Sequence, residues 1–341
     1  MTDKPAILED DVVSQVSRHI LDMADASRQQ VLSHANRELI ILYYNVGKYL
    51  TEISAKYKWG DGYIDNIAGS IAVANPSIKG FDRRNLYRMK QFYLTYPDSE
   101  FVVTLSSQLS WSSNVLIMSR SKSSEEREFY TNLAIRERYS VRELRRQMDS
   151  AYYERAMLSS QKLEPVPVPS QIKDVFMDTY VLDFLDMPND YSEDDLQQAI
   201  VNNLRDFILE FGKDFTFVGQ KYKLKVGNHD YFLDLLFFHR GLTCLVNIEL
   251  KIGEFKPEYM GKMQLYLEAL DRDVKKPYEN PSVGIILCAS KDDEVVEYAM
   301  SRTMSPTLVA QYQLTLPDKS ILEQKLREYV DLAERRLLNE D

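Results

Sequence analysis

Cysteine, histidine and glycine are scarce in this chain of 341 residues, which has 2 Cys, 4 His and 12 Gly. Cys244 and Cys288 both lie in apolar, strand-like runs, so we interpret them as reduced core residues and exclude a disulfide framework. The four histidines lack the spacing of zinc ligands. No glycine-rich phosphate loop occurs, which argues against ATP hydrolysis.

Long apolar runs are also missing, since no stretch reaches the ~18 residues that a membrane span needs. The acidic start, MTDKPAILEDD, lacks the pattern of a signal peptide. We therefore expect a cytoplasmic protein with no membrane association. The formal net charge of −10 argues against a surface coated in basic residues, so contact with nucleic acid would be confined to particular faces.

The length predicts two domains, and one segment is a clear boundary between them. Residues 159–171 contain prolines at 165, 167 and 169, an alternation that favours extended polyproline II structure over helix. We therefore predict a helical domain over residues 1–158, a proline-rich linker over 159–171, and a second domain over 172–341.

The N-terminal half has helical periodicity throughout. The first helix is predicted over Asp10–Ser54, with an inward stripe of Leu39, Leu42, Val46 and Leu50. Further helices are predicted over residues 61–74, 82–96, 111–118, 123–136 and 140–157.

One of these helices, which Asp82 caps, has a polar face opposite its apolar stripe. Cations, an aromatic ring and an amide of this kind contact phosphates and base edges in DNA-binding proteins. With the preceding helix, the segment is similar to a helix-turn-helix, although the connection is longer than a tight turn. A solvated helix face is an equally good interpretation. The candidate DNA-binding residues are Arg83, Arg84, Tyr87, Arg88 and Gln91.

The C-terminal half alternates helix and strand patterns, which predicts a mixed sheet with helices on both faces, an α/β fold. Helices are predicted over residues 192–211, 257–270 and 320–338. Strands are predicted over 215–218, 220–226, 283–289 and 308–316, together with a hairpin over 231–251.

The predicted hairpin carries three charged residues inside apolar runs: Asp234 in the first strand, and Glu249 and Lys251 in the second. Folding about the turn brings Asp234 opposite Glu249 or one step diagonal to it. Lys251 can neutralise only one carboxylate, so the other needs a raised pKa, open solvent or a cation. A divalent cation such as Mg²⁺ suits the pair. The alternative is a surface ion pair beside a stray carboxylate.

The spacing Asp234-x14-Glu249-x-Lys251 resembles the PD-(D/E)XK nuclease core, with Leu233 in place of the usual proline. The wider strings FVGQKYKL, DLLFFHRGL and NIELKIGEFKPEYMGKMQLYL, together with the helical N-terminal half, resemble the YhcG-type family of nucleases over nearly the whole chain. The resemblance implies a restriction-endonuclease-like C-terminal domain and a helical, DNA-binding N-terminal domain.

The resemblance also implies roles for individual residues. Asp234, Glu249 and the carbonyl of Leu250 would hold Mg²⁺, with Mn²⁺ as an alternative, and Lys251 would orient water or stabilise charge on phosphate. Glu210 would support the metal site, although a surface glutamate is as good an interpretation. Gln264 would line the catalytic cleft, although edge polar groups are usually ordinary boundary residues.

The sequence therefore predicts a metal-dependent nuclease that hydrolyses DNA and binds it through its N-terminal domain. The alternative is a DNA-binding or scaffolding protein whose nuclease fold is catalytically silent. RNA is a less favoured substrate. A homodimer or higher oligomer would suit an enzyme that makes two cuts on two strands, but no residue proves one.

Overall fold

A computed structural model describes residues 10–57, 62–163, 169–301, 303 and 306–328. The chain divides into two compact units, residues 1–144 and 145–341. The predicted linker falls partly outside the described residues, which omit 164–168. Helix α8 (Tyr152–Leu163) extends into the predicted linker, so residues 159–163 are helical where we expected extended chain. The predicted domain boundary stays a prediction.

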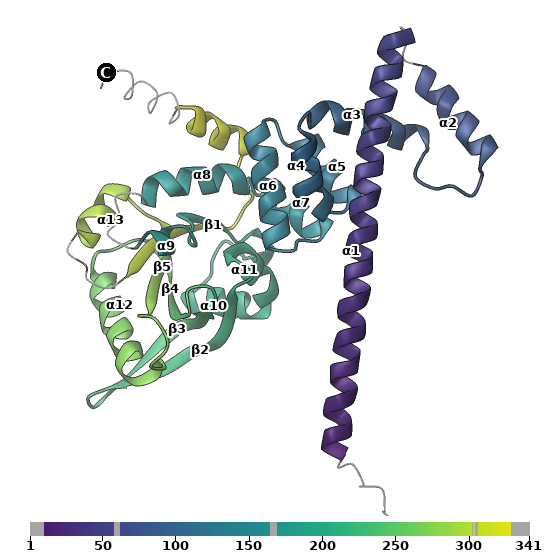
Figure 1. Ribbon diagram of the computed structural model, residues 1–341. Helices are drawn as coiled ribbons and strands as arrows, with labels where there is room; N and C mark the ends of the chain where they lie inside the picture. Colours follow the sequence, from purple (N-terminus) through teal and green to yellow (C-terminus); the bar gives the residue numbers. More distant parts are fainter. Residues whose placement is uncertain (1–9, 58–61, 164–168, 302, 304–305, 329–341) are drawn as a thin grey trace, which may run out of the picture. The chain divides into compact units, whose positions relative to one another are not determined.

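Helices make up the described part of the first unit, as the sequence predicted (Figure 1). They are α1 (Asp10–Tyr57), α2 (Tyr63–Ala74), α3 (Arg83–Thr95), α4 (Ser99–Thr104), the 3₁₀ turn η1 (Ser106–Gln108), α5 (Trp111–Arg120) and α6 (Ser124–Arg136). Helix α7 (Val141–Asp149) begins in this unit and ends in the second. None of the described helices is long and apolar enough to cross a membrane.

Helix α1 packs closely on α3 at Gly47, where any Cβ would collide with the backbone of Met89. The buried face of α1 is formed by Ile40, Tyr43 and Leu50 and their neighbours. Our predicted inward stripe was partly wrong, because Leu39 is 38% and Leu42 is 45% exposed. The helix has apolar residues on two faces, and spacing alone cannot tell which one packs.

Helix α3 begins where the sequence predicted. The side chain of Asp82 accepts a hydrogen bond of 3.0 Å from the backbone N–H of Asn85, which satisfies one of the free donors of the first turn. Leu86, Met89 and Phe92 are buried. The candidate DNA-binding residues lie away from this buried face of α3. Among them, Arg83, Arg84 and Gln91 are exposed, whereas Tyr87 and Arg88 are half-buried.

The second unit is built on a six-stranded mixed sheet in the order β1-β6-β5-β4-β3-β2. Strands β2, β3 and β4 form an antiparallel meander, whereas β4, β5, β6 and β1 run parallel. The strands are β1 (Thr179–Val181), β2 (Phe215–Val226), β3 (His229–His239), β4 (Cys244–Glu254), β5 (Val283–Ser290) and β6 (Thr307–Gln313). Strand β1 was not predicted, because it is only three residues long.

Helices cover both faces of this sheet, which confirms the predicted α/β class. Alternate residues of β4 enter different cores, with Val246 and Ile248 on one side and Leu245 on the other. The first core contains α9 (Ser170–Lys173), α10 (Glu193–Asn202) and α11 (Leu204–Phe211). The second contains α12 (Glu258–Ala269) and α13 (Asp293–Met300). Gly284 of β5 lets Met263 of α12 lie directly on the sheet.

Three predicted elements differ in detail. The helix predicted over 192–211 is two helices that meet at Asn203, and the helix predicted over 140–157 is α7 and α8, separated at Ala151, whose φ is +52°. Strand β6 ends at Gln313 rather than at residue 316. The closing helix is present over residues 319–328, beyond which the structure describes nothing.

Candidate active site

The predicted hairpin forms, and its register brings the two carboxylates level with each other. Leu235 of β3 pairs with Ile248 of β4, which places Asp234 and Glu249 one residue further along, opposite each other. Both lie on the face of the sheet that α12 covers, because Leu236 and Leu245 on that face enter the α12 core. Two carboxylates therefore lie on a mainly apolar sheet face, beside the buried amide of Asn247.

The side chain of Asp234 accepts a backbone hydrogen bond from β4 just beyond Leu235 and Ile248, the last paired residues of β3 and β4 at this end. Its Oδ2 accepts a hydrogen bond of 2.8 Å from the backbone N–H of Leu250. The side-chain amide of Gln197, on α10, donates to the backbone carbonyl of Asp234. Asp234 is therefore fixed from two directions while remaining half-buried.

Glu249 is nearly buried, with a side chain 4% exposed, and its two oxygens differ. Oε1 accepts from the ammonium group of Lys262, on α12, and lies 3.5 Å from Nζ of Lys251. Oε2 is buried and has no hydrogen-bond partner among the described residues. A buried carboxylate oxygen without a partner carries a large desolvation cost, so this atom is available for a ligand.

Lys251 is held by several groups. Its Nζ donates to Oε2 of Glu193, on α10, at 2.9 Å and to the carbonyl of Leu250 at 2.6 Å, and it lies 5.5 Å from the ring centre of Tyr259. Burial alone would lower the pKa of Lys251, but Glu193 and Glu249 raise it above the ordinary value. The ammonium therefore stays charged.

The two carboxylates also perturb each other. Burial, and after it the negative charge of Glu249, raise the pKa of Asp234 from 3.8 to about 6, although the hydrogen bond from Leu250 limits the rise. A further positive charge beside Asp234 and Glu249, added to those of Lys251 and Lys262, would oppose this rise in pKa, because it would stabilise both ionised carboxylates.

The oxygen atoms of the site suit a hard divalent cation. The described residues contain no cluster of three or more His, Cys, Asp or Glu side chains that could hold a metal, so protein carboxylates would supply two ligand groups here. Asp234, Glu249 and the Leu250 carbonyl offer the oxygen donors that Mg²⁺ and Mn²⁺ prefer, with water completing the shell. The unpartnered Oε2 of Glu249 fits this use.

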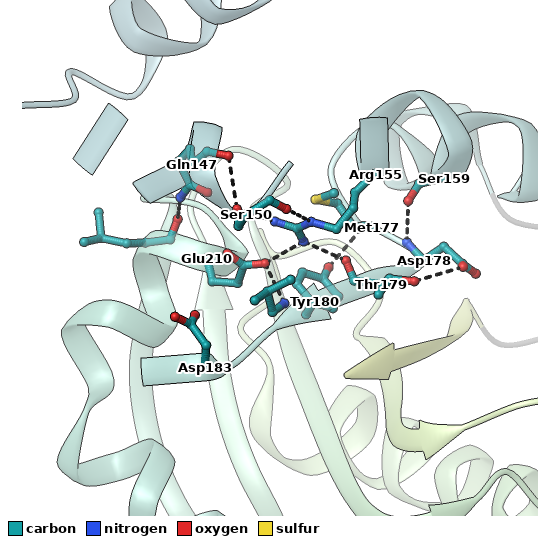
Figure 2. A network of polar contacts seen from close by, with 12 residues as sticks. Gln147, Ser150, Arg155, Ser159, Met177, Asp178, Thr179, Tyr180, Asp183 and Glu210 are labelled. Carbon is teal, nitrogen blue, oxygen red and sulfur yellow. Dashed lines mark hydrogen bonds and ion pairs between the residues drawn. The ribbon is translucent and has the colours of Figure 1, made fainter. Parts of the chain in front are cut away.

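Glu210 lies in a different cluster, shown in Figure 2. Its Oε1 accepts from Nη1 of Arg155 at 2.7 Å and from the backbone N–H of Val181 at 2.8 Å. Its Oε2 accepts from Nη1 of Arg146 at 3.0 Å. The structure thus surrounds Glu210 with arginines instead of placing it beside Asp234. Arg146 also donates to the carbonyl of Val181 and to Oδ1 of Asp183.

Gln264 is half-buried on α12, and the residue of this helix that reaches Glu249 is Lys262. Residues two positions apart on a helix are about 200° apart around its axis, so the two side chains point in different directions. Lys262, Glu193 and Gln197 were not predicted from the sequence. Each lies on a helix, α12 or α10, and the strand pattern of the hairpin does not show which helical side chains face it. Only the tertiary fold brings them there.

The candidate DNA-binding residues lie together in the first unit. Arg83, Arg84, Tyr87, Arg88 and Gln91 line one open depression of about 810 Å³ on α3, with Asp82 at its end. Arg83 has an ion pair with Asp65, and its guanidinium lies 5.4 Å from the ring centre of Tyr87. Arg84 and Gln91 are exposed, whereas Arg88 is half-buried.

Two family models match the chain along most of its length. Residues 19–155 match the "DUF1016 N-terminal domain", and residues 173–328 match the "YhcG PDDEXK nuclease domain". The chain is 30% identical to "Putative nuclease YhcG" of Escherichia coli (strain K12) over 350 aligned positions, which cover 92% of this chain and 93% of that protein. The chain belongs to the YhcG family. Its C-terminal unit therefore contains a PD-(D/E)XK nuclease domain, as the resemblance implied.

Two solved structures were also matched. A repair endonuclease from Pyrococcus abyssi is 16% identical, with a TM-score of 0.26, and the match covers 38% of this chain and half of that one. EndoMS in its apo form gives 16% identity and a TM-score of 0.25 over similar shares. The YhcG assignment does not depend on either structure. The hairpin carboxylates lie within the nuclease match, and the α3 depression lies within the DUF1016 match.

Proposed function

We propose that this protein is a divalent-metal-dependent deoxyribonuclease whose active site is formed by Asp234, Glu249 and Lys251. The observation that carries the proposal is Oε2 of Glu249, a buried carboxylate oxygen without a hydrogen-bond partner in the described part of a chain that belongs to a nuclease family. Glu210, the other buried glutamate discussed above, has both of its oxygens hydrogen-bonded.

Asp234, Glu249 and the carbonyl of Leu250 would hold Mg²⁺ or Mn²⁺. When bound, such an ion polarises a phosphate and makes water more acidic. The N–H of Leu250 fixes the orientation of the Asp234 carboxylate, and Gln197 fixes its backbone. Glu193 holds the ammonium of Lys251 beside Glu249, where it can stabilise charge that develops on the phosphate.

Cleavage assays on purified variants test this proposal. Supercoiled, linear, branched and single-stranded DNA are incubated with Mg²⁺ or Mn²⁺, together with RNA of matched sequence. Asp234→Ala, Glu249→Ala and Lys251→Ala should each lose cleavage while keeping the far-UV circular dichroism of the native protein. Unchanged cleavage by all three variants would refute the assignment, and equal cleavage of RNA would refute the preference for DNA.

A catalytically silent protein is the competing function, and the ion pairs of Lys251 and Lys262 with Glu249 favour it, because they neutralise the carboxylate without a metal. Calorimetric titration of Mn²⁺ into the native protein and into Glu249→Ala distinguishes the two. A heat of binding that depends on Glu249 supports the nuclease, whereas no binding supports the silent protein.

We also propose that the α3 depression binds the DNA backbone. Its arginines, the ring of Tyr87 and the amide of Gln91 line one open surface, which is the arrangement that phosphate contacts require. Arg84→Ala with Arg88→Ala should weaken DNA affinity about equally for unrelated sequences and reduce its salt dependence. Arg142→Ala, which removes an arginine on another helix, is the control. Equal losses in the control would contradict the proposal. The expected homodimer stays a prediction.

A further inference from the structure

The candidate active site contains two lysines that share one oxygen, and they are held very differently. Lys251 donates to Glu193 and to the Leu250 carbonyl, and its side chain is 11% exposed. Lys262 donates to Oε1 of Glu249, lies 5.2 Å from the ring centre of Tyr266, and is 45% exposed. Lys251 is fixed in the site, whereas Lys262 reaches it from the solvent side.

The net charge of the site indicates that a divalent cation could replace one of these ammonium groups beside Glu249. Asp234, Glu249 and Glu193 carry three negative charges, and Lys251 and Lys262 carry two positive ones, so the sum is −1. A divalent cation added to this set gives +1, but with Lys262 removed it gives 0. Since like charges repel strongly in a partly buried site, a bound cation favours departure of the more exposed ammonium.

We propose that Lys262 is the exchangeable counter-ion of Glu249: it neutralises this carboxylate when no metal is bound, and it moves to a substrate phosphate when a divalent cation takes its place. This inference rests on the proposed metal-dependent nuclease and adds a second positive group that contacts the substrate. The flexible stem of a lysine allows its ammonium to change partners without movement of α12.

Two observations place Lys262 where a phosphate could meet it. Oε1 of Glu249 is its partner, so its ammonium already lies at the edge of the carboxylate pair that would hold the cation. Tyr266, one turn later on α12, anchors this edge, since its hydroxyl donates 3.2 Å to the carbonyl of Phe232 on β3. A phosphate that bridges the cation would therefore lie within reach of the displaced ammonium.

The decisive measurement is Mn²⁺ affinity without DNA, by calorimetry, for the native protein, Lys262→Gln and Lys262→Arg. Removal of a competing ammonium should tighten Mn²⁺ binding by Lys262→Gln roughly tenfold, whereas Lys262→Arg keeps the positive charge and should not bind more tightly than the native protein. If Lys262 merely positioned Glu249, Lys262→Gln would bind Mn²⁺ more weakly than the native protein. The direction of the change in Mn²⁺ affinity therefore distinguishes a competing ammonium from a positioning one. Unchanged affinity would also overturn the inference.

Cleavage kinetics test the second half of the proposal. At saturating Mn²⁺, Lys262→Gln should lose roughly tenfold in kcat/KM for DNA, and the slope of its log kcat/KM against log salt should become shallower by about one. If the salt slope of Lys262→Gln equals that of the native protein, the ammonium of Lys262 does not contact a phosphate, and the proposed substrate contact is overturned.

Lys256→Gln is the matched control, because Lys256 is an exposed lysine just before α12 and its substitution makes the same change in net charge. It should leave both Mn²⁺ affinity and the salt slope unchanged; a tenfold gain there would mean that any lost positive charge tightens binding, and would overturn the inference. A native protein that binds no Mn²⁺ would overturn the proposed function and the inference together, whereas native binding with no gain in Lys262→Gln overturns the inference alone.

Discussion

Two buried glutamates in the same unit, Glu210 and Glu249, have opposite surroundings. Glu210 has no exposed side-chain surface. One of its oxygens accepts from Arg155 (Figure 2), and the other accepts from Arg146. Glu249 is 4% exposed and has both of its ammonium partners on Oε1, whereas its Oε2 has no hydrogen-bond partner among the residues that the structure describes. The two glutamates are therefore alike in burial and differ in how many of their oxygens are hydrogen-bonded, and the proposed cation would use the unpartnered oxygen of Glu249.

The largest expected effect on the free energy of unfolding comes from Glu210. Glu210→Ala leaves the guanidinium of Arg155, only 2% exposed, without its carboxylate, and should cost about 3–5 kcal/mol. Urea unfolding at neutral pH measures the loss. Asp183→Asn is the control, because Asp183 is a 29% exposed partner of Arg146 and its loss should cost much less. If Glu210→Ala lowers the free energy of unfolding by less than about 1 kcal/mol, Glu210 and Glu249 do not differ in their contribution to stability.

Glu249 should matter to stability mainly through metal. Mn²⁺ at a hundred times its dissociation constant should stabilise the native protein by about 2.7 kcal/mol and leave Glu249→Gln unchanged. Without metal, the substitution should change the free energy of unfolding by less than about 1 kcal/mol, because Lys262 is 45% exposed and can turn to water. Urea unfolding with Mn²⁺ and with a chelator gives both values, and equal stabilisation of Glu249→Gln by Mn²⁺ would contradict this prediction.

Asp234 should make stability depend on pH. Its pKa rises from 3.8 to about 6 on folding, so between these values the folded state binds more protons than the unfolded state. The free energy of unfolding of the metal-free protein should therefore fall as the pH rises from about 4 to about 6, and then stay level. Asp234→Asn avoids the cost of the buried charge, and should be about 1–2 kcal/mol more stable than the native protein at pH 7.5 without metal.

Unfolding of both proteins at pH 4, 6 and 7.5 checks this prediction. The difference between them should be near zero at pH 4 and largest at pH 7.5. A native protein that gains stability relative to Asp234→Asn as the pH rises would show that Asp234 is paired in the folded state rather than desolvated.

The smallest effect on the free energy of unfolding is expected at an exposed ion pair whose N–O distance is similar to those of Glu210 with its arginines. Nζ of Lys221 lies 3.0 Å from Oδ1 of Asp194, but the side chains are 57% and 76% exposed. Lys221→Gln should change the free energy of unfolding by no more than about 0.5 kcal/mol, because solvent screens the pair. A loss comparable with that of Glu210→Ala would mean that distance, and not burial, sets the strength of these ion pairs.

Local patterns predicted much of the second unit. Alternation of apolar residues indicated the hairpin, and the spacing of Asp234, Glu249 and Lys251 indicated that their side chains would meet, which the register confirms. The resemblance to the YhcG family was also confirmed. Strand β1 was missed because three residues carry too little pattern, and it is held mainly by its parallel pairing with β6.

The sequence by itself determined which residues alternate along the hairpin, where Asp82 begins a helix, and which charged groups share one strand face, because these follow from bonded geometry and from neighbours close in the chain. Only the tertiary structure decided that Glu210 meets two arginines and that Glu193 and Lys262 reach the carboxylate pair. Spacing along the chain does not encode these contacts, because they depend on how the helices pack on the two faces of the sheet.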